Sequence, residues 1–253
     1  MSPRARGILA TLAALALAPG ALAVLRAMPA FGDHPLPYGD AVNRIAPAER
    51  IVSNMVTAVN FDLRGFDTLG EEVMLLAAVV GTVVVLRGSR GEGVGDRPAT
   101  CGDRPIPPRS EAVVLLCRII APLTLLYGLY VVLHAQLTPG GGFQGGAIIG
   151  SGLLLVWVGE GYNAWRRLVP GVVLHALEGG GAGLYALMGF GAMLTGAAFL
   201  TNVLPLGEWG SILSGGVIPV VNFGVGLAVS GAFGMLFLEF LEETREPKDG
   251  EEP

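Results

Sequence analysis

The chain has little of the chemistry on which most enzymes and metalloproteins depend. Of its 253 residues only 15% are charged, three are histidines and two are cysteines. Cys101 and Cys117 form no Cys-x-x-Cys pattern, which argues against a disulfide framework and against a zinc or iron–sulfur site. Lysine occurs once, at Lys248, and no basic patch is interleaved with aromatic residues, so nucleic acid is not an expected partner. No nucleophile–base pattern or phosphate loop is visible either, so we expect no catalytic residue, no metal and no cofactor.

Apolar residues, in contrast, are abundant. They make up 52% of the chain, and the mean hydropathy is +0.60, which is a membrane composition. A helix needs about 20 apolar residues to cross a bilayer, and six segments reach or approach that length. They are Ile8–Leu25, Leu69–Leu86, Ala112–His134, Gly145–Gly161, Ala176–Thr201 and Val217–Leu241. The sequence therefore predicts an all-α polytopic membrane protein with about six transmembrane helices, two before a polar linker and four after it.

The polar linker divides the chain. Residues 88–109 are rich in Gly, Pro, Arg and Asp and have no apolar periodicity. We therefore expect a two-helix membrane module in residues 1–90, a cytoplasmic linker in 91–110, a four-helix membrane domain in 111–241 and an acidic cytoplasmic tail in 242–253. Residues 1–25 also fit a cleavable signal peptide, and both interpretations leave the following loop outside.

The distribution of arginine and lysine predicts the orientation. The positive-inside rule places both termini and the linker in the cytoplasm and the turn around residue 140 outside. The side expected to be cytoplasmic holds Arg4, Arg6, Arg87, Arg90, Arg97, Arg104, Arg109, Arg166, Arg167, Arg245 and Lys248. Only Arg26, Arg44, Arg50 and Arg64 lie on the other side, all in the first long loop.

A glycine-dense turn lies between two apolar runs at residues 134–146, and residue types alone also allow a plain extramembrane connector. The order LYGLYVVLHAQLTPGGGFQGGAIIGSG around it resembles the MnhB/MrpB family, the B-type subunits of Mrp-type multisubunit Na⁺/H⁺ antiporters. Further matching stretches extend the resemblance over about residues 111–241. We expect the turn to be a packed structure that contacts a neighbouring subunit. Its residues are Pro139, Gly140, Gly141, Gly142, Phe143, Gly145 and Gly146.

Small residues four apart, such as Gly146/Gly150 and Gly179/Gly183, predict close helix packing.

The first half carries a second resemblance. The order Asp62-x-Arg64-x-x-Asp67-Thr-x-Gly-Glu71 is similar to the last part of the large A-type subunit of these antiporters, a module that recurs as a small, MbhE-like subunit of membrane-bound hydrogenases. Glu72 replaces the apolar residue usual at its position in that family. The module is fused here in front of the MnhB-like part.

These resemblances imply an accessory subunit, not an enzyme. Its complex would exchange cytoplasmic Na⁺ for external protons, driven by the proton motive force, in a bacterial cell membrane that the chain crosses several times. The chain would work with large proton-channel subunits and small subunits in the lipid bilayer, and its lack of intramembrane lysine indicates that it does not pump alone. Two alternatives stay open: a membrane-arm subunit of a complex-I-related ion-pumping hydrogenase or oxidoreductase, and a purely structural scaffold.

Several ionisable residues are candidates for an ion or proton path, because such groups are costly at membrane depth. They are Asp62, Arg64, Asp67, Glu71, Glu72, His134 and Glu178. Glu71 is preferred, although capping of a helix N-terminus explains the acids before the second segment equally well. Glu178 either belongs to a relay with His175 or completes a helix start with it, and His134 is a relay or a plain hydrogen bonder. We expect Arg118 to reach the interface with its long side chain, and Glu239 to be solvated.

Overall fold

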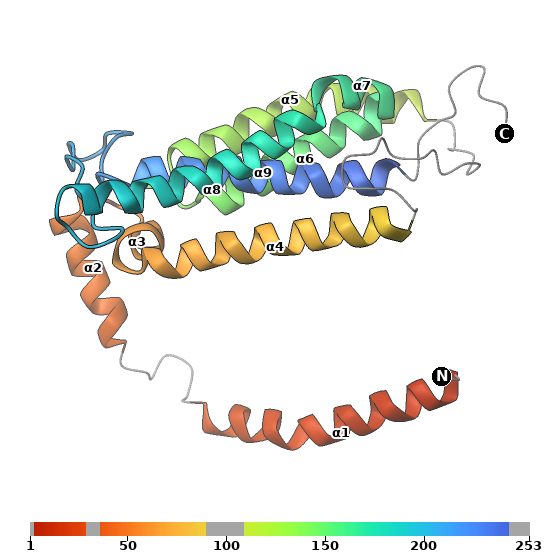
Figure 1. Cartoon of the computed structure of the whole chain (residues 1–253), viewed down its shortest axis with the longest axis horizontal. Helices are drawn as coiled ribbons and strands as arrows, with labels where there is room; N and C mark the ends of the chain where they lie inside the picture. The colour runs from red at the N-terminus through yellow and green to blue at the C-terminus, as the bar shows by residue number, and fades with distance from the viewer. Residues whose placement is uncertain (1–2, 29–35, 90–108, 243–253) are drawn as a thin grey trace. The chain divides into compact units, whose positions relative to one another are not determined.

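A computed structural model describes residues 3–28, 36–89 and 109–242, and the elements of that part of the chain are all helices (Figure 1). Residues 1–41 and 42–253 form two separate compact units, with the boundary inside helix α2. The all-α membrane fold predicted from the sequence is confirmed. Five described helices, α1, α4, α5, α6 and α9, are long and apolar enough to cross a membrane.

The first unit contains α1 (Pro3–Ala27) and the start of α2 (Pro37–Glu49). Helix α1 is apolar around its whole circumference, and side chains such as Leu15 and Leu17 are exposed. A helix that is hydrophobic on all sides suits contact with lipid or with another membrane protein.

The second unit is a bundle around one central helix. Its elements are α3 (Met55–Ala58), the π-helix η1 (Val59–Leu63), α4 (Gly65–Ser89), α5 (Glu111–Leu133), α6 (Gly142–Glu160), α7 (Tyr162–Leu168), α8 (Gly171–Leu194) and α9 (Ile218–Glu242). Helix α9 contacts α4, α5, α6 and α8, and Figure 1 shows it running between α4 and the other three. It is the most buried of the candidate spanning helices, so its sequence is apolar or small on nearly every side.

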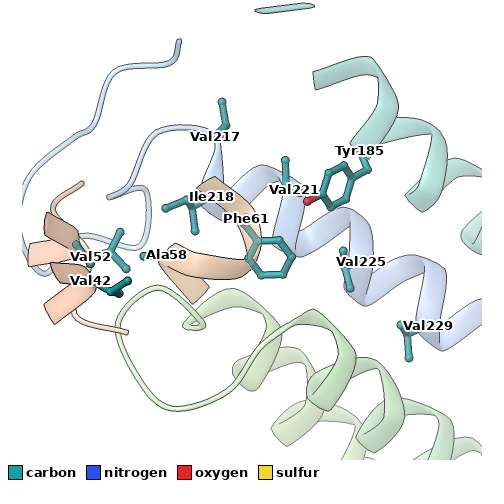
Figure 2. Packing of buried hydrophobic residues seen from close by; sticks show 11 residues of the cluster. Val42, Val52, Ala58, Phe61, Tyr185, Val217, Ile218, Val221, Val225 and Val229 are labelled. Carbon is teal, nitrogen blue, oxygen red and sulfur yellow. The ribbon is translucent and has the colours of Figure 1, made fainter. Parts of the chain in front are cut away.

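Two hydrophobic cores lie along α9. The first core consists of Val42, Ala46, Val52, Ala58, Phe61, Tyr185, Val217, Ile218, Val221, Val225 and Val229. The second core consists of Val79, Val83, Tyr162, Trp165, Val169, Leu174, Ala232, Met235, Leu238 and Leu241. Figure 2 shows Val221, Val225 and Val229 following one another along α9 in the first core, the i, i+4 spacing that keeps side chains on one helix face.

Small residues set the helix spacing. A Cβ atom at Gly146 would lie 2.7 Å from the Val229 Cβ, and one at Gly150 2.8 Å from the Phe233 Cβ, so α6 approaches α9 at these glycines as expected. The expectation for Gly179 and Gly183 is wrong within the described residues, because no atom of another described element lies within 4 Å of a Cβ built at either position. That face of α8 is open to lipid or to another subunit.

Helix boundaries differ from the sequence-based ones in three places. Helix α4 begins at Gly65, so Glu71 and Glu72 lie in its second turn, not at its start. Helix α8 spans Gly171–Leu194, not 176–201, and it is not among the five described helices that are long and apolar enough to cross a membrane. Helix α6 begins at Gly142, so residues 142–146 of the predicted glycine turn are helical.

Candidate functional site

The glycine turn is held in place by the polar segment that precedes α3. The Asn54 Nδ2 donates to three carbonyl oxygens of the turn, those of Ala135 at 2.7 Å, Thr138 at 3.0 Å and Gly140 at 3.3 Å. The Oδ1 of the same side chain accepts from Val56 N at 3.1 Å and so caps α3. Asn54 thus provides partners for backbone groups that a non-helical turn would otherwise leave unpaired.

A second asparagine fixes the turn from the other side. Asn222 of α9 is fully buried, donates to Val132 O at 2.6 Å and accepts from Gly142 N at 2.6 Å. A Cβ at Gly142 would lie 2.5 Å from Asn222 O, and one at Gly145 2.4 Å from the Val132 Cγ2. These glycines therefore allow the start of α6 to touch α9 and α5. The turn proper needs glycine for its backbone only at Gly140, where φ is +152°.

The turn is packed, as the sequence predicted, but its described contacts are within the chain. Residues 53–57 and Asn222 provide them, and Phe143 is half-buried against the first core. Exposed Pro139 and Gln144 remain beside a cavity of ≈ 320 Å³. Contact of the turn with a neighbouring subunit stays a prediction. Pro139 and Gln144 are the exposed residues of the turn through which such a contact would form.

One group of acids is paired with cations. The Asp62 Oδ2 lies 2.6 Å from the Arg50 Nε and accepts from Asn202 Nδ2 at 2.9 Å. The arginine contact has the distance of an ion pair without the alignment of a hydrogen bond. Arg64 pairs with Asp67, and both side chains are exposed. An open cavity of ≈ 520 Å³ is lined by Arg50, Asp62 and Arg64. Because arginines neutralise the charges of these acids, the ion pairs indicate a structural role for them.

A second group of acids has no cation partner within the part of the chain that the structure describes. Glu72 of α4 and Glu178 of α8 are buried and close enough to interact electrostatically, and the Oε1 atom of each lacks a hydrogen-bond partner. Beside them the Tyr185 hydroxyl donates to Gly65 O at 2.7 Å and is hydrogen-bonded by the Thr68 side chain. Tyr185, which the sequence did not single out, thus ties α8 to the start of α4. Carboxyl groups of this kind can hold and release protons.

The other candidates do not join this pair. Glu71 lies one residue from Glu72 but is exposed on the bundle surface. His134 stacks on Tyr130, with ring centroids 4.2 Å apart, and its Nδ1 lies 3.1 Å from Tyr130 O. His175 is exposed while Glu178 is buried, and no hydrogen bond or ion pair joins the two, so the expected pairing is wrong.

Two arginines form ion pairs at the end of the bundle away from the glycine turn. Glu239 is 1% exposed and accepts from the Arg87 Nε at 2.8 Å and Nη2 at 2.6 Å, so the expectation that it is solvated is wrong. Its burial follows from the packing of α4 against α9, which a single sequence does not reveal. Arg118 is exposed, as expected of an interfacial arginine, and it pairs with Glu160 of α6.

Comparison with known proteins places this arrangement in a family. Residues 112–235 match the family model described as a domain related to the MnhB subunit of Na⁺/H⁺ antiporters. An uncharacterized protein of Methanocaldococcus jannaschii is 31% identical over 208 residues, which cover 74% of this chain and 77% of that one. The B-type subunit of the Na⁺/H⁺ antiporter of Bacillus subtilis is 33% identical over 85 residues, 34% of this chain and 59% of that protein.

Two solved structures share the fold. A chain of the Mrp complex from Dietzia sp. superposes with a TM-score of 0.74 at 24% identity, covering 100% of this chain and 27% of that one. A chain of the membrane-bound sulfane sulfur reductase, an archaeal respiratory membrane complex, superposes with a TM-score of 0.70 at 25% identity, covering 93% of this chain and 98% of that one. The second of these is a membrane complex, and the chain, with five described helices suited to span a bilayer, is a multi-pass membrane protein. It belongs to the family of proteins related to the MnhB subunit of Na⁺/H⁺ antiporters.

Proposed function

We propose that the chain is an accessory membrane subunit of a multisubunit antiporter that exchanges Na⁺ for protons at the expense of the proton motive force. The MnhB-related domain in residues 112–235 carries this proposal, since the named relatives of that domain are B-type antiporter subunits. Residues 42–89 pack against this domain and correspond to a module that resembles the end of the large A-type subunit. The complex works with large proton-conducting subunits, and the chain is a transporter component without catalysis of its own.

Purification of the native complex through a tag on this chain tests the assignment. The expected co-purifying proteins are antiporter subunits, and vesicles containing the complex dissipate a ΔpH when Na⁺ is added without any redox substrate. Vesicles in which Na⁺ has no effect on the ΔpH, although the complex is intact, would contradict the antiport assignment.

Within the complex, Glu71 is our choice for a residue that lines a hydrated path to a large partner subunit. It lies in the second turn of a spanning helix, and its side chain is exposed on the bundle surface. An acid there faces lipid unless another subunit covers it, and lipid contact is costly for an ionisable group. The partner surface that covers Glu71 therefore provides polar groups or water.

The substitution Glu71→Gln tests this role because it keeps the size and hydrogen bonding of the side chain but removes its titration. We expect a fully assembled complex with depressed Na⁺-dependent ΔpH dissipation. Glu208→Gln, which neutralises an exposed loop acid, is the matched control. Wild-type antiport across pH 7–9 in an assembled Glu71→Gln complex would leave Glu71 as an interfacial residue only.

The glycine turn is assigned to assembly. Pro139 and Gln144 are exposed beside the turn cavity, and Phe143 positions the start of α6 against the first core. Phe143→Ala should weaken complex assembly or antiport while the bundle stays folded. Normal assembly and normal activity of this variant would reduce the turn to a connector.

A second candidate function has one specific observation in its favour. The match to the sulfane sulfur reductase covers 98% of that chain, whereas the match to the Mrp complex covers only part of a longer one. The chain could accordingly serve a redox-driven relative in which ion movement depends on electron transfer. Iron–sulfur subunits in the purified complex, together with ΔpH changes that require a reductant, are the result that favours this function over antiport.

A further inference from the structure

Among the described residues, two buried carboxyl groups without a cation partner come to the same level of the bundle, because α4 and α8 run antiparallel and pack against each other. The Tyr185 hydroxyl of α8 is bonded to Gly65 O at the start of α4. Glu72 lies seven residues after Gly65 (72 − 65), and Glu178 lies seven residues before Tyr185 (185 − 178). Seven residues are about two helical turns, or about 10 Å, so the same two faces meet again with one glutamate on each.

Both glutamates are buried and incompletely bonded. The exposed fraction is 2% for Glu72 and 4% for Glu178, and the Oε1 atom of each has no hydrogen-bond partner. Buried polar atoms in proteins are nearly always paired, so two orphaned carboxyl oxygens in one place indicate that something is bound between or beside them.

The surroundings are apolar and tightly packed. Along α8, Glu178 lies four residues after Leu174 of the second core and seven residues before Tyr185 of the first core. On α9, a Cβ built at Gly231 would lie 2.6 Å from Glu178 N, so the two backbones are in direct contact. The α9 residues next to Gly231 do not titrate, and the hydroxyl of Ser230 donates to Gly226 O within its own helix.

The charged residues of the helices packed around the pair do not neutralise it. Arg64, at the start of α4, pairs with Asp67, and Arg87, fifteen residues beyond Glu72 on α4 (87 − 72), pairs with Glu239. His175 is exposed, and Glu71, also exposed, adds negative charge beside Glu72. Among the described residues, neither glutamate has an ion pair with a cation.

Two ionised carboxylates at such a place would repel each other in a medium that screens them poorly. A single proton shared between two neighbouring carboxyl groups removes the repulsion and gives one unpaired oxygen a donor, the arrangement used by carboxylate dyads in other proteins. The Tyr185 hydroxyl, which is close enough to Glu72 to interact with it electrostatically, is engaged in hydrogen bonds with Gly65 O and the Thr68 side chain, which favours a proton over a metal cation as the bound species.

We propose that Glu72 and Glu178 form a proton-binding pair that holds one proton in common across the interface between α4 and α8. Proton exchange at this pair involves only the making and breaking of O–H bonds. The pair lies between the N-terminal module and the MnhB-related domain. Binding or release of the proton therefore affects the packing of these two parts of the chain. The proposal goes beyond the antiport assignment and does not depend on it.

Infrared titration of the purified complex in lipid, without an ion gradient, tests the pair. The carbonyl band of protonated carboxylic acids is followed with pH in the wild type, Glu72→Gln, Glu178→Gln and the double variant, with Glu208→Gln as control. In the wild type we expect a band lost in two steps more than about one pH unit apart, as for coupled groups. Each single variant should show one step, and the double variant should lack both.

Three results would overturn the proposal. A wild-type titration equal to the sum of the two single variants would mean that the groups titrate independently. A band unaffected by either substitution would mean that neither glutamate holds a proton. A band that falls when Na⁺ replaces choline at fixed pH would identify a cation site instead. If Glu72→Gln does not assemble, Glu178→Gln decides alone, because Glu72 must then titrate in a single step.

Discussion

The close approach of α8 to α9 at Gly181 can be tested by adding one methyl group. A Cβ at Gly181 would lie 2.3 Å from Gly224 O, 2.5 Å from Ala228 N and 2.9 Å from the Ala228 Cβ. Two of these three atoms belong to the backbone, so no side-chain rotation relieves the overlap and the helices must separate. Overpacking of a tight core costs about 1–3 kcal/mol, and contacts with backbone belong at the upper end of that range.

The neighbouring position Gly180 provides the matched control. No atom from any other part of the described chain lies within 4 Å of a Cβ built there, and Gly180 occupies the same helix interior. Each Gly→Ala substitution gains about 1 kcal/mol of helix propensity, which cancels in the comparison. The difference between the two variants therefore isolates the packing cost, and we expect Gly181→Ala to be less stable than Gly180→Ala by about 3 kcal/mol.

The measurement is the apparent Tm of the detergent-solubilised complex, followed through this chain. A change of 1 kcal/mol shifts Tm by about 2–4 °C at this chain length, so we expect Gly181→Ala to melt about 6–12 °C below Gly180→Ala. Gly183→Ala, on the open face of α8, controls for contact of that face with another subunit. Equal Tm values for Gly181→Ala and Gly180→Ala would refute the close contact between α8 and α9.

Three further predictions concern other contacts. Arg87→Ala removes the arginine that pairs with the buried Glu239 carboxylate and should lower the stability by about 3–5 kcal/mol. The Arg87→Ala/Glu239→Ala double variant should lose less than the sum of the two single variants, and additive losses would show that the pair is not coupled. Asn222→Leu removes the partners of two buried backbone groups and should cost about 2–4 kcal/mol in the same Tm assay, whereas an unchanged Tm would mean that the clamp is dispensable. A cysteine at the exposed position 139 should be labelled by an impermeant reagent from outside the cell, because the arginine distribution predicts that the turn lies outside. Labelling from the cytoplasmic side alone would show that the orientation is the reverse.

The sequence predicted the membrane helices because the bilayer imposes a length that a run of apolar residues reveals. The spans from Glu111 to Leu133 and from Ile218 to Glu242 differ from the expected segments by a few residues at most. The glycine turn was also recognised, but its helical part was not. Gly142 and Gly145 suit a helix that touches two others, and the sequence alone could not distinguish that use of glycine from a turn.

The sequence could not show which side of a spanning helix faces inward. In α4 both the buried side and the exposed side are apolar, since lipid and protein interior are equally hydrophobic, and no amphipathic pattern separates Glu71 from Glu72. Consecutive residues differ by about 100° around a helix, so one position decides between the surface and the interior. The related module usually has an apolar residue at position 72. This departure favoured Glu71 as the residue that fits the family pattern, whereas in the structure Glu72 is the buried acid.

Contacts near both ends of α4 determine its rotation and thereby place Glu72. Near the start, Gly65 O accepts from the Tyr185 hydroxyl, and near the other end Arg87 bonds Glu239 of α9. Apolar side chains give little preference among rotations in a membrane, because lipid is as hydrophobic as the neighbouring helices, so directional polar contacts select one. Rotation of α4 by one residue, which would bring Glu71 inward, would turn the Arg87 side chain away from Glu239. The energy that holds Glu72 opposite Glu178 therefore comes from contacts about two turns away on one side and about four turns away on the other.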